Sequence, residues 1–191
     1  MRTITNNKKP YITKTLAVFI IGLLAINWVY NNSLEQAEAS SYSLQDQIRL
    51  DRIRGCIEGY KANKERVDEI YLHTKQNKIA RCATYATLVY AKESWWGKSD
   101  RCLTRYNCFW IRNSTHQSGV SYKLDYNNFK IYRNYEDANT DFGHLYFKWH
   151  FNRSWYDFVR VWSETDQQTY TSFINDNYNE VYKEILTLIS L

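Results

Sequence analysis

The chain has 191 residues and a mass of 23.0 kDa, a length that suits one domain of ordinary size and not two. Its 44% hydrophobic and 24% charged residues exclude a disordered chain and a membrane protein with many spans. The formal net charge of +5 is small and unclustered, so nucleic acid is not an expected partner. A single proline, Pro10, and six glycines favour a mostly helical body. Aromatic residues are unusually abundant, at 17%.

The first 39 residues have the pattern of an export signal. Residues 1–14 contain four basic and no acidic residues, and an apolar run, LAVFIIGLLAINWVY, follows from Leu16 to Tyr30. As a helix this run would be about 22 Å long, shorter than the ~30 Å hydrocarbon core of a membrane, which favours a signal peptide. Ala37 and Ala39 offer a cleavage site, and an uncleaved membrane anchor stays open. We therefore predict an extracytoplasmic protein that is secreted, periplasmic or anchored to the inner membrane.

All four cysteines follow this segment. In an oxidising compartment we expect them to form disulfides, and four cysteines allow three pairings. Cys102 and Cys108 bracket a short loop, so we pair them, and Cys56 with Cys82 then links two helices. Four reduced cysteines are one alternative. A metal site is another, disfavoured because the sequence has no C-x-x-C and its histidines lack ligand spacing, so we expect neither metal nor cofactor.

Residues 40–191 are predicted to form one domain, because neither an internal repeat nor a Gly/Ser- or Pro-rich linker interrupts them. Helical spacing predicts a first helix from about Ser43 to Tyr60 and a second, short one around 67–71. The alanine-rich run over 78–94 is apolar on all sides, which predicts a helix buried at the centre of the domain.

The second half of the domain begins with residues 100–133, where β-branched and aromatic residues alternate with turn formers. Gly119 and Asn127-Asn128 there predict an irregular loop that contains a hairpin. Helices return over 134–150 and 154–162, and a last one begins at Asp166, a good N-cap. The predicted fold is therefore mainly α (α+β), with helices around a central helix and a small hairpin lobe.

Glu93 is the candidate general acid. It lies at the end of the apolar helix and is followed directly by Ser94, Trp95, Trp96 and Gly97. Apolar neighbours disfavour the charged form of a carboxyl and raise its pKa, as a tryptophan does for the catalytic glutamate of lysozyme. The alternative is a solvated Glu93 that pairs with a neighbouring lysine.

The aromatic residues that follow Glu93 predict a carbohydrate-binding surface. Trp95, Trp96, Phe109 and Trp110 lie within one stretch together with several tyrosines. Aromatic rings with polar edges suit the apolar faces and hydroxyl groups of sugars. The alternative is that these rings fill a core that has few Leu and Met residues.

At these residues the sequence resembles the bacterial endo-β-N-acetylglucosaminidase family of autolysins and flagellar muramidase-type hydrolases. The family's E-S-G-W-G-x-S is similar to residues 93–99, ESWWGKS, with Trp95 in the place of the first Gly. Its N-x-F-G-I-K is similar to residues 107–112, NCFWIR, with Trp110 in the place of Gly.

Two later motifs extend the resemblance over roughly residues 65–190. The family's F-R-x-Y is similar to residues 129–132, FKIY, which precede Glu136-Asp137. Its T-D-x-x-Y segment is similar to Thr165-Asp166, with Tyr170 slightly displaced. The four blocks follow the family's order.

The resemblance implies a lysozyme-like helical domain over residues 40–191 that hydrolyses β-1,4 linkages of peptidoglycan or a related N-acetylated glycan. Glu93 would be the general acid, and Asn107, Phe109 and Tyr132 would line the glycan cleft. Trp95, Trp96 and Trp110 would contact the substrate, and the two tryptophans in glycine places would reshape the cleft.

The second catalytic group is open. The family's second carboxylate has no counterpart in Thr115-His116-Gln117-Ser118-Gly119, and Asp125 is the nearest acid. If Asp125 does not serve, the 2-acetamido group of the substrate would act as internal nucleophile, assisted by Tyr132.

Other functions remain as alternatives. A lytic transglycosylase would use the same glutamate, although the G-L-M-Q-like segment usual in those enzymes is absent. A non-catalytic glycan-binding protein would explain the missing second carboxylate. A serine or cysteine hydrolase is disfavoured because the sequence has no G-x-S-x-G.

Overall fold

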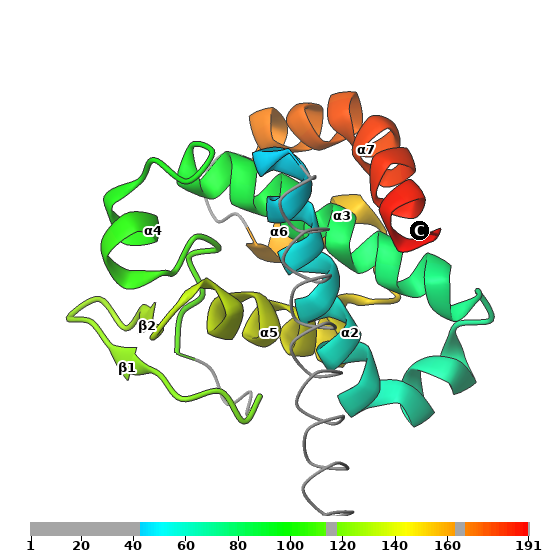
Figure 1. Cartoon of the computed structure of the whole chain (residues 1–191), viewed down its shortest axis with the longest axis horizontal. Helices are drawn as coiled ribbons and strands as arrows, with labels where there is room; N and C mark the ends of the chain where they lie inside the picture. Colours follow the sequence, from blue (N-terminus) through cyan, green and yellow to red (C-terminus); the bar gives the residue numbers. More distant parts are fainter. Residues whose placement is uncertain (1–42, 114–117, 163–166, 191) are drawn as a thin grey trace, which may run out of the picture. The chain divides into compact units, whose positions relative to one another are not determined.

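The structure is a computed structural model that describes residues 43–113, 118–162 and 167–190. The described part is mostly helical and has one small antiparallel hairpin, as Figure 1 shows, which confirms the predicted fold class at this level. The predicted signal or anchor over residues 1–39 lies outside the described residues. The elements are α2 (Leu44–Ile70), α3 (Lys75–Ser94), α4 (Asp100–Arg105), β1 (Lys123–Leu124), β2 (Lys130–Ile131), α5 (Tyr135–Leu145), the π-helical turn η1 (Tyr146–His150), α6 (Trp155–Trp162) and α7 (Gln167–Ser190).

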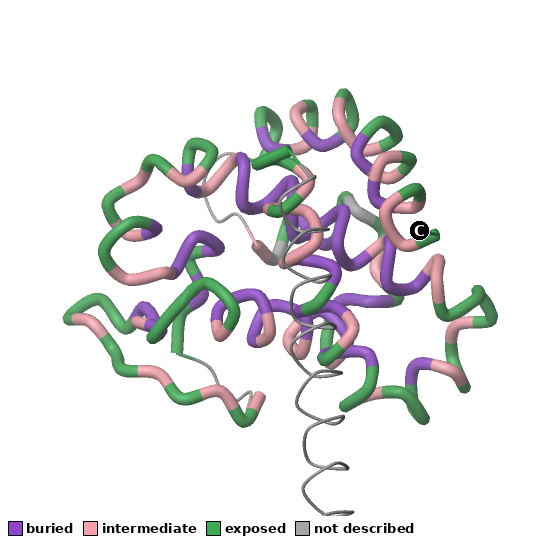
Figure 2. Tube along the Cα trace, viewed as in Figure 1, coloured by how far each residue is buried: buried purple, intermediate pink, exposed green. Residues whose placement is uncertain are grey.

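Helix α3 is the central helix that the sequence predicts. It begins after Thr74, whose hydroxyl accepts a hydrogen bond from the backbone N–H of Asn77 at 3.3 Å. Helices α2, α5 and α7 pack against it, and Figure 2 shows the buried residues along its length. Its buried Thr84 and Thr87 hydroxyls donate to backbone carbonyls one turn earlier, each at 2.8 Å. Polar groups on this helix are therefore satisfied inside the core.

The prediction of a break between residues 60 and 67 is wrong, because α2 is continuous from Leu44 to Ile70. The intervening residues are mostly polar and exposed, and they contain neither glycine nor proline. Salt bridges between residues one turn apart stabilise the helix through this stretch. They join Lys61 to Glu58 and Lys64 to Asp68, each at 2.7 Å.

Close backbone contact between α2 and α5 depends on glycine. A Cβ atom added to Gly59 would lie 2.1 Å from the carbonyl carbon of Gly143, and one added to Gly143 would lie 2.1 Å from the carbonyl oxygen of Gly55. Any larger residue would push the helices apart. This crossing fixes α5 and, with it, the hairpin that leads into α5.

Both predicted disulfides are confirmed. Cys56–Cys82 joins α2 to α3 with 5.9 Å between the Cα atoms, and Cys102–Cys108 closes the turn that follows α4. The disulfides indicate an oxidising, extracytoplasmic environment. Within the described ranges, no helix has the length and apolar character needed to cross a membrane.

The segment predicted as a loop with a hairpin contains both, together with the short helix α4, which sequence periodicity did not indicate. Ser99 caps α4 by accepting from the N–H of Cys102 at 3.3 Å. In the hairpin Lys123 faces Ile131 and Leu124 faces Lys130. The predicted helices over 134–150, 154–162 and the C-terminal segment are present, whereas the proposed cap Asp166 lies outside the described residues.

Candidate active site

Glu93 occupies the last turn of α3 and is partly buried. Burial raises the pKa of its carboxyl and outweighs the opposite effects of the Tyr170 hydroxyl and the Lys92 ammonium group. Tyr170 comes from α7 and is buried, and its own pKa is raised by burial and then by Glu93. The two groups interact electrostatically, yet no hydrogen bond of ordinary geometry reaches the Tyr170 hydroxyl from the described residues. The direction of the Glu93 shift is the one that a general acid requires.

The turn after Glu93 has a left-handed backbone at three successive residues. The φ angles are +52° at Trp95, +57° at Trp96 and +82° at Gly97. The Ser94 hydroxyl holds this turn by donating to the Tyr90 carbonyl at 2.5 Å and accepting from the Gly97 N–H at 2.7 Å. A left-handed conformation costs a bulky residue about 1–2 kcal/mol.

The two tryptophans of this turn are 78% and 58% exposed, so they do not fill the core. They border a pocket of about 360 Å³ whose lining residues are Ala91, Lys92, Trp95, Trp96, Lys98 and Phe173. Glu93 is a neighbour of this pocket in the chain but is not among its lining residues. The pocket therefore combines ring faces with two cationic groups, and the carboxyl of Glu93 is not part of its lining.

Asn107 and Phe109, expected to line the glycan cleft, lie in the interior. The Asn107 amide donates to the carbonyls of Ile111 and Lys130 and accepts from the Ile111 N–H, each at 2.8 Å. Phe109 is buried and its ring centroid lies 4.7 Å from that of Phe142. Both side chains hold the loop onto the helices, and solvent does not reach them.

Tyr132, the candidate assisting group, is also buried. Its hydroxyl donates to the Asp141 carboxylate at 2.6 Å, and Lys130 pairs with the same carboxylate oxygen at 2.8 Å. Burial, followed by the negative charge of Asp141, raises the pKa of Tyr132 well above its usual value. These contacts engage the hydroxyl within the protein.

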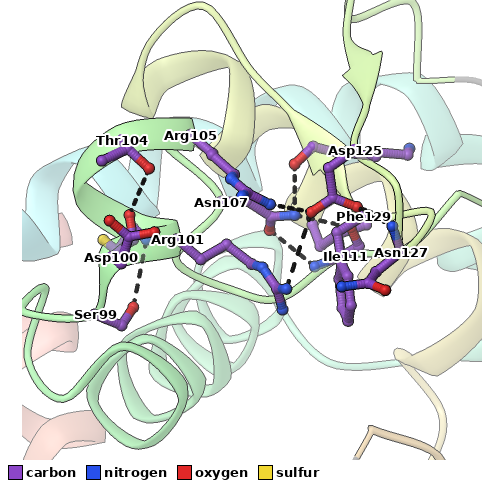
Figure 3. Close-up of polar contacts among 12 residues, drawn as sticks. Ser99, Asp100, Arg101, Thr104, Arg105, Asn107, Ile111, Asp125, Asn127 and Phe129 are labelled. Carbon is purple, nitrogen blue, oxygen red and sulfur yellow. Dashed lines mark hydrogen bonds and ion pairs between the residues drawn. The ribbon is translucent and has the colours of Figure 1, made fainter.

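Asp125, the nearest candidate for the second carboxylate, organises the hairpin turn (Figure 3). Its carboxylate accepts from the backbone N–H groups of Asn127 and Phe129 at 2.8 and 2.9 Å and pairs with Arg105, while Arg101 lies 3.9 Å away. Burial opposes ionisation, but the two backbone N–H groups and the arginines outweigh it and lower the pKa of Asp125. The lowered pKa keeps the carboxylate ionised at neutral pH, and at 4% exposure the side chain is almost fully enclosed by these partners.

Trp110 lies beside this cluster and, like Trp95, has a left-handed backbone, with φ at +55°. It is 40% exposed, and the guanidinium carbon of Arg101 lies 4.2 Å from its ring centroid. The same guanidinium lies 3.8 Å from the ring of Phe129, which meets Trp110 edge to face at 5.7 Å. Trp110 is thus packed against Arg101 and Phe129 and remains partly exposed.

Three residues with evident roles were missed as site residues. Arg101 and Arg105 hold Asp125, and two separate arginines in a predicted loop gave no signal for this. Tyr170 meets Glu93 from 77 positions further along the chain. Its place in the T-D-x-x-Y resemblance was the available signal.

The predicted residues therefore separate into a group at or near one pocket and an interior group. Trp95 and Trp96 line one pocket, and Glu93 lies next to them in the chain. The side chains of Asn107, Phe109 and Tyr132 are buried, and that of Asp125 is enclosed by its partners. In the described residues no cluster of three or more His, Cys, Asp or Glu side chains is arranged to hold a metal ion. Comparison of the chain with family models, curated proteins and solved structures gave no match.

Proposed function

We propose that this protein is an exported glycosidase that hydrolyses β-1,4 linkages of peptidoglycan strands, with Glu93 as the general acid. The observation that carries the proposal is the backbone geometry at Trp95 and Trp110. Both occupy places where the glucosaminidase-like motifs have glycine, and both have φ values, +52° and +55°, that favour glycine. A non-glycine residue with positive φ is uncommon, so the geometry supports the alignment of both motifs.

The surroundings of Glu93 support the assigned role. A general acid must keep its proton near working pH, and burial shifts the pKa of Glu93 in that direction. The exposed Trp95 and Trp96 rings offer flat apolar surfaces to sugar rings. Lys92 and Lys98 on the same pocket suit the carboxylates of a peptidoglycan strand.

The mechanism that fits these residues uses the substrate's own acetamido group. Glu93 donates its proton to the glycosidic oxygen as the C1–O bond breaks, and the acetamido oxygen bonds to C1. Water then attacks C1, releases the acetamido oxygen and returns a proton to Glu93. Asp125 and Tyr132 have no direct part in this route, because the contacts described above already engage their oxygen atoms.

The test is Glu93→Gln, which keeps the shape of the side chain and removes the acid. We expect sugar release from purified cell walls to fall at least about 100-fold, the usual contribution of a general acid. Glu180→Gln, an exposed position on α7, is the matched control and keeps full activity. In the unaltered chain the rate should fall as pH rises through the raised pKa of Glu93. Equal sugar release by the Glu93→Gln variant would refute the assignment.

The products separate hydrolysis from transglycosylation. Mass spectrometry should find reducing ends, whereas a lytic transglycosylase would leave anhydro sugars.

A non-catalytic glycan-binding protein is the second candidate function. It is favoured because Glu93 does not line the neighbouring pocket and Asp125 is enclosed by its partners. Its signature would be binding to cell walls without sugar release, unchanged by Glu93→Gln.

A further inference from the structure

A second pocket lies at the opposite end of α3 from Glu93. It has a volume of about 260 Å³, and four separate segments of the chain line it. Arg81, one of its lining residues, precedes Glu93 by three turns of α3, a distance of about 18 Å along the helix. The lining residues are Tyr71, His73, Asn77, Arg81, Tyr85, Ser154, Tyr178 and Tyr182.

Five of the eight lining residues of this pocket carry an aromatic ring. Tyr178 and Tyr182, one turn apart on α7, are nearly parallel, with 12° between planes and 5.8 Å between centroids. On the link between α2 and α3, Tyr71 and His73 have ring centroids 4.4 Å apart. Tyr71, Tyr178 and Tyr182 are only partly buried, whereas Tyr85 belongs to the core. The partly buried rings therefore offer surface to a ligand as well as packing against the helices.

Arg81 is held in a fixed position within this pocket. Its guanidinium donates to the Tyr71 hydroxyl at 2.6 Å and to the carbonyl of Arg153. It also lies 5.5 Å from the Tyr71 ring and 5.8 Å from the Tyr85 ring. A guanidinium has five N–H donors, so these two bonds leave donors for an incoming acceptor. No carboxylate is among the lining residues.

Asn77 adds an amide to the same pocket. Among the described parts of the chain its side chain has no hydrogen-bond partner, while its backbone N–H is engaged in the cap of α3. Burial raises the pKa of Tyr178 and of Tyr182, so both hydroxyls keep their protons at neutral pH. The pocket thus presents ring faces and neutral or cationic hydrogen-bonding groups.

We propose that this pocket binds one pyranose ring of an N-acetylated glycan. The apolar face of the sugar would lie on the Tyr178–Tyr182 pair, and its acetamido group would meet Arg81 and Asn77. A volume of about 260 Å³ is below the 300–1,000 Å³ of pockets for drug-sized ligands, so one ring fits and a longer stretch does not. The site would hold the glycan away from Glu93, and it does not depend on Glu93 being catalytic.

The test is a titration of the full chain, carrying Glu93→Gln to prevent cleavage, with the tetramer of N-acetylglucosamine. The side-chain amide signal of Asn77 in a two-dimensional ¹H–¹⁵N NMR spectrum reports on this pocket, and the indole signals of Trp95 and Trp96 report on the other. We expect the Asn77 signal to shift with saturation. Tyr182→Ala should weaken the binding measured at Asn77 about tenfold, since it removes half of the ring pair.

Two variants serve as controls. Tyr182→Phe keeps the ring and should keep the binding, and Tyr126→Ala removes an 87% exposed tyrosine of the hairpin turn and should change nothing. An unmoved Asn77 signal would overturn the proposal, and so would shifts confined to Trp95 and Trp96 or equal binding by Tyr182→Ala. If Tyr182→Ala fails to fold, the titration of Asn77 decides. Loss of sugar release in Glu93→Gln is a separate measurement, so failure of one proposal leaves the other standing.

Discussion

Replacement of Trp95 by glycine is expected to stabilise the protein. The residue has φ at +52° and is 78% exposed, so its ring contributes little buried area. The folded protein buries only the remaining 22% of the surface of Trp95. Real unfolded chains already bury about 10–40% of their side-chain surface, so folding adds almost no burial at this position. Release from the left-handed strain gains about 1–2 kcal/mol, and the freedom of glycine in the unfolded chain costs about 0.5–1 kcal/mol. We expect a net gain of about 0.5–1 kcal/mol in the free energy of unfolding.

The same substitution at Trp110 should have the opposite sign. With 40% of the residue exposed, about 120 Å² is buried, and its loss costs about 3 kcal/mol. The ring also loses its contacts with Arg101 and Phe129, at 4.2 and 5.7 Å. The relief of strain at φ +55° offsets only part of this. The freedom of glycine in the unfolded chain costs a further ~0.5–1 kcal/mol, and the lost ring contacts cost about 1 kcal/mol beyond the buried area, so we expect Trp110→Gly to destabilise by about 3 kcal/mol in total.

Urea unfolding of the full chain with intact disulfides measures both changes by linear extrapolation. Trp95→Ala is the matched control, because it removes the ring but keeps the strain, and it should remain within about 0.5 kcal/mol of the parent. If Trp95→Gly is no more stable than Trp95→Ala, or if both tryptophans respond alike, the reasoning from backbone geometry is refuted.

Two further predictions concern the rest of the scaffold. Asp125→Asn should destabilise the protein at neutral pH. The difference in unfolding free energy between parent and variant should shrink as pH falls below 3.8, through the lowered pKa of Asp125. Urea unfolding across pH measures this difference, and a pH-independent value would contradict the prediction. Replacing Cys56 and Cys82 by alanine should lower the unfolding free energy by about 3.5 kcal/mol, against about 2 kcal/mol for Cys102 and Cys108. The reason is loop length, because the first disulfide closes a loop with a sequence separation of 26 and the second one of 6. Thermal unfolding of the two double variants checks this order.

Local patterns predicted much of the fold. The apolar run over 78–94 leaves no polar face, so its helix had to be buried, and α3 is the centre of the domain. The spacing of the cysteines gave the correct pairing. The predicted break in α2 failed because a polar stretch without glycine or proline can continue a helix while it faces solvent. The short α4 escaped because six residues hold too little periodicity.

The candidate site was predicted only where its parts are neighbours in the chain. Glu93 and the two tryptophans after it are adjacent in the sequence, and the predicted direction of the Glu93 pKa shift is confirmed, whereas the role of these residues stays a prediction. The interior positions of Phe109 and Tyr132 could not be predicted, because the sequence does not show whether an aromatic residue in a loop is buried or exposed to solvent.

The sequence by itself determined a disulfide-linked helical domain with a carboxyl beside two tryptophans, since helix periodicity and cysteine spacing are local properties of the chain. Only the tertiary structure decided that Tyr170 faces Glu93, that Asp125 is bound by Arg105, and that α7 forms a tyrosine-lined pocket with α3. Each of these contacts joins segments that are distant in sequence. Helix packing decides which distant segments come into contact, and local periodicity carries no information about it.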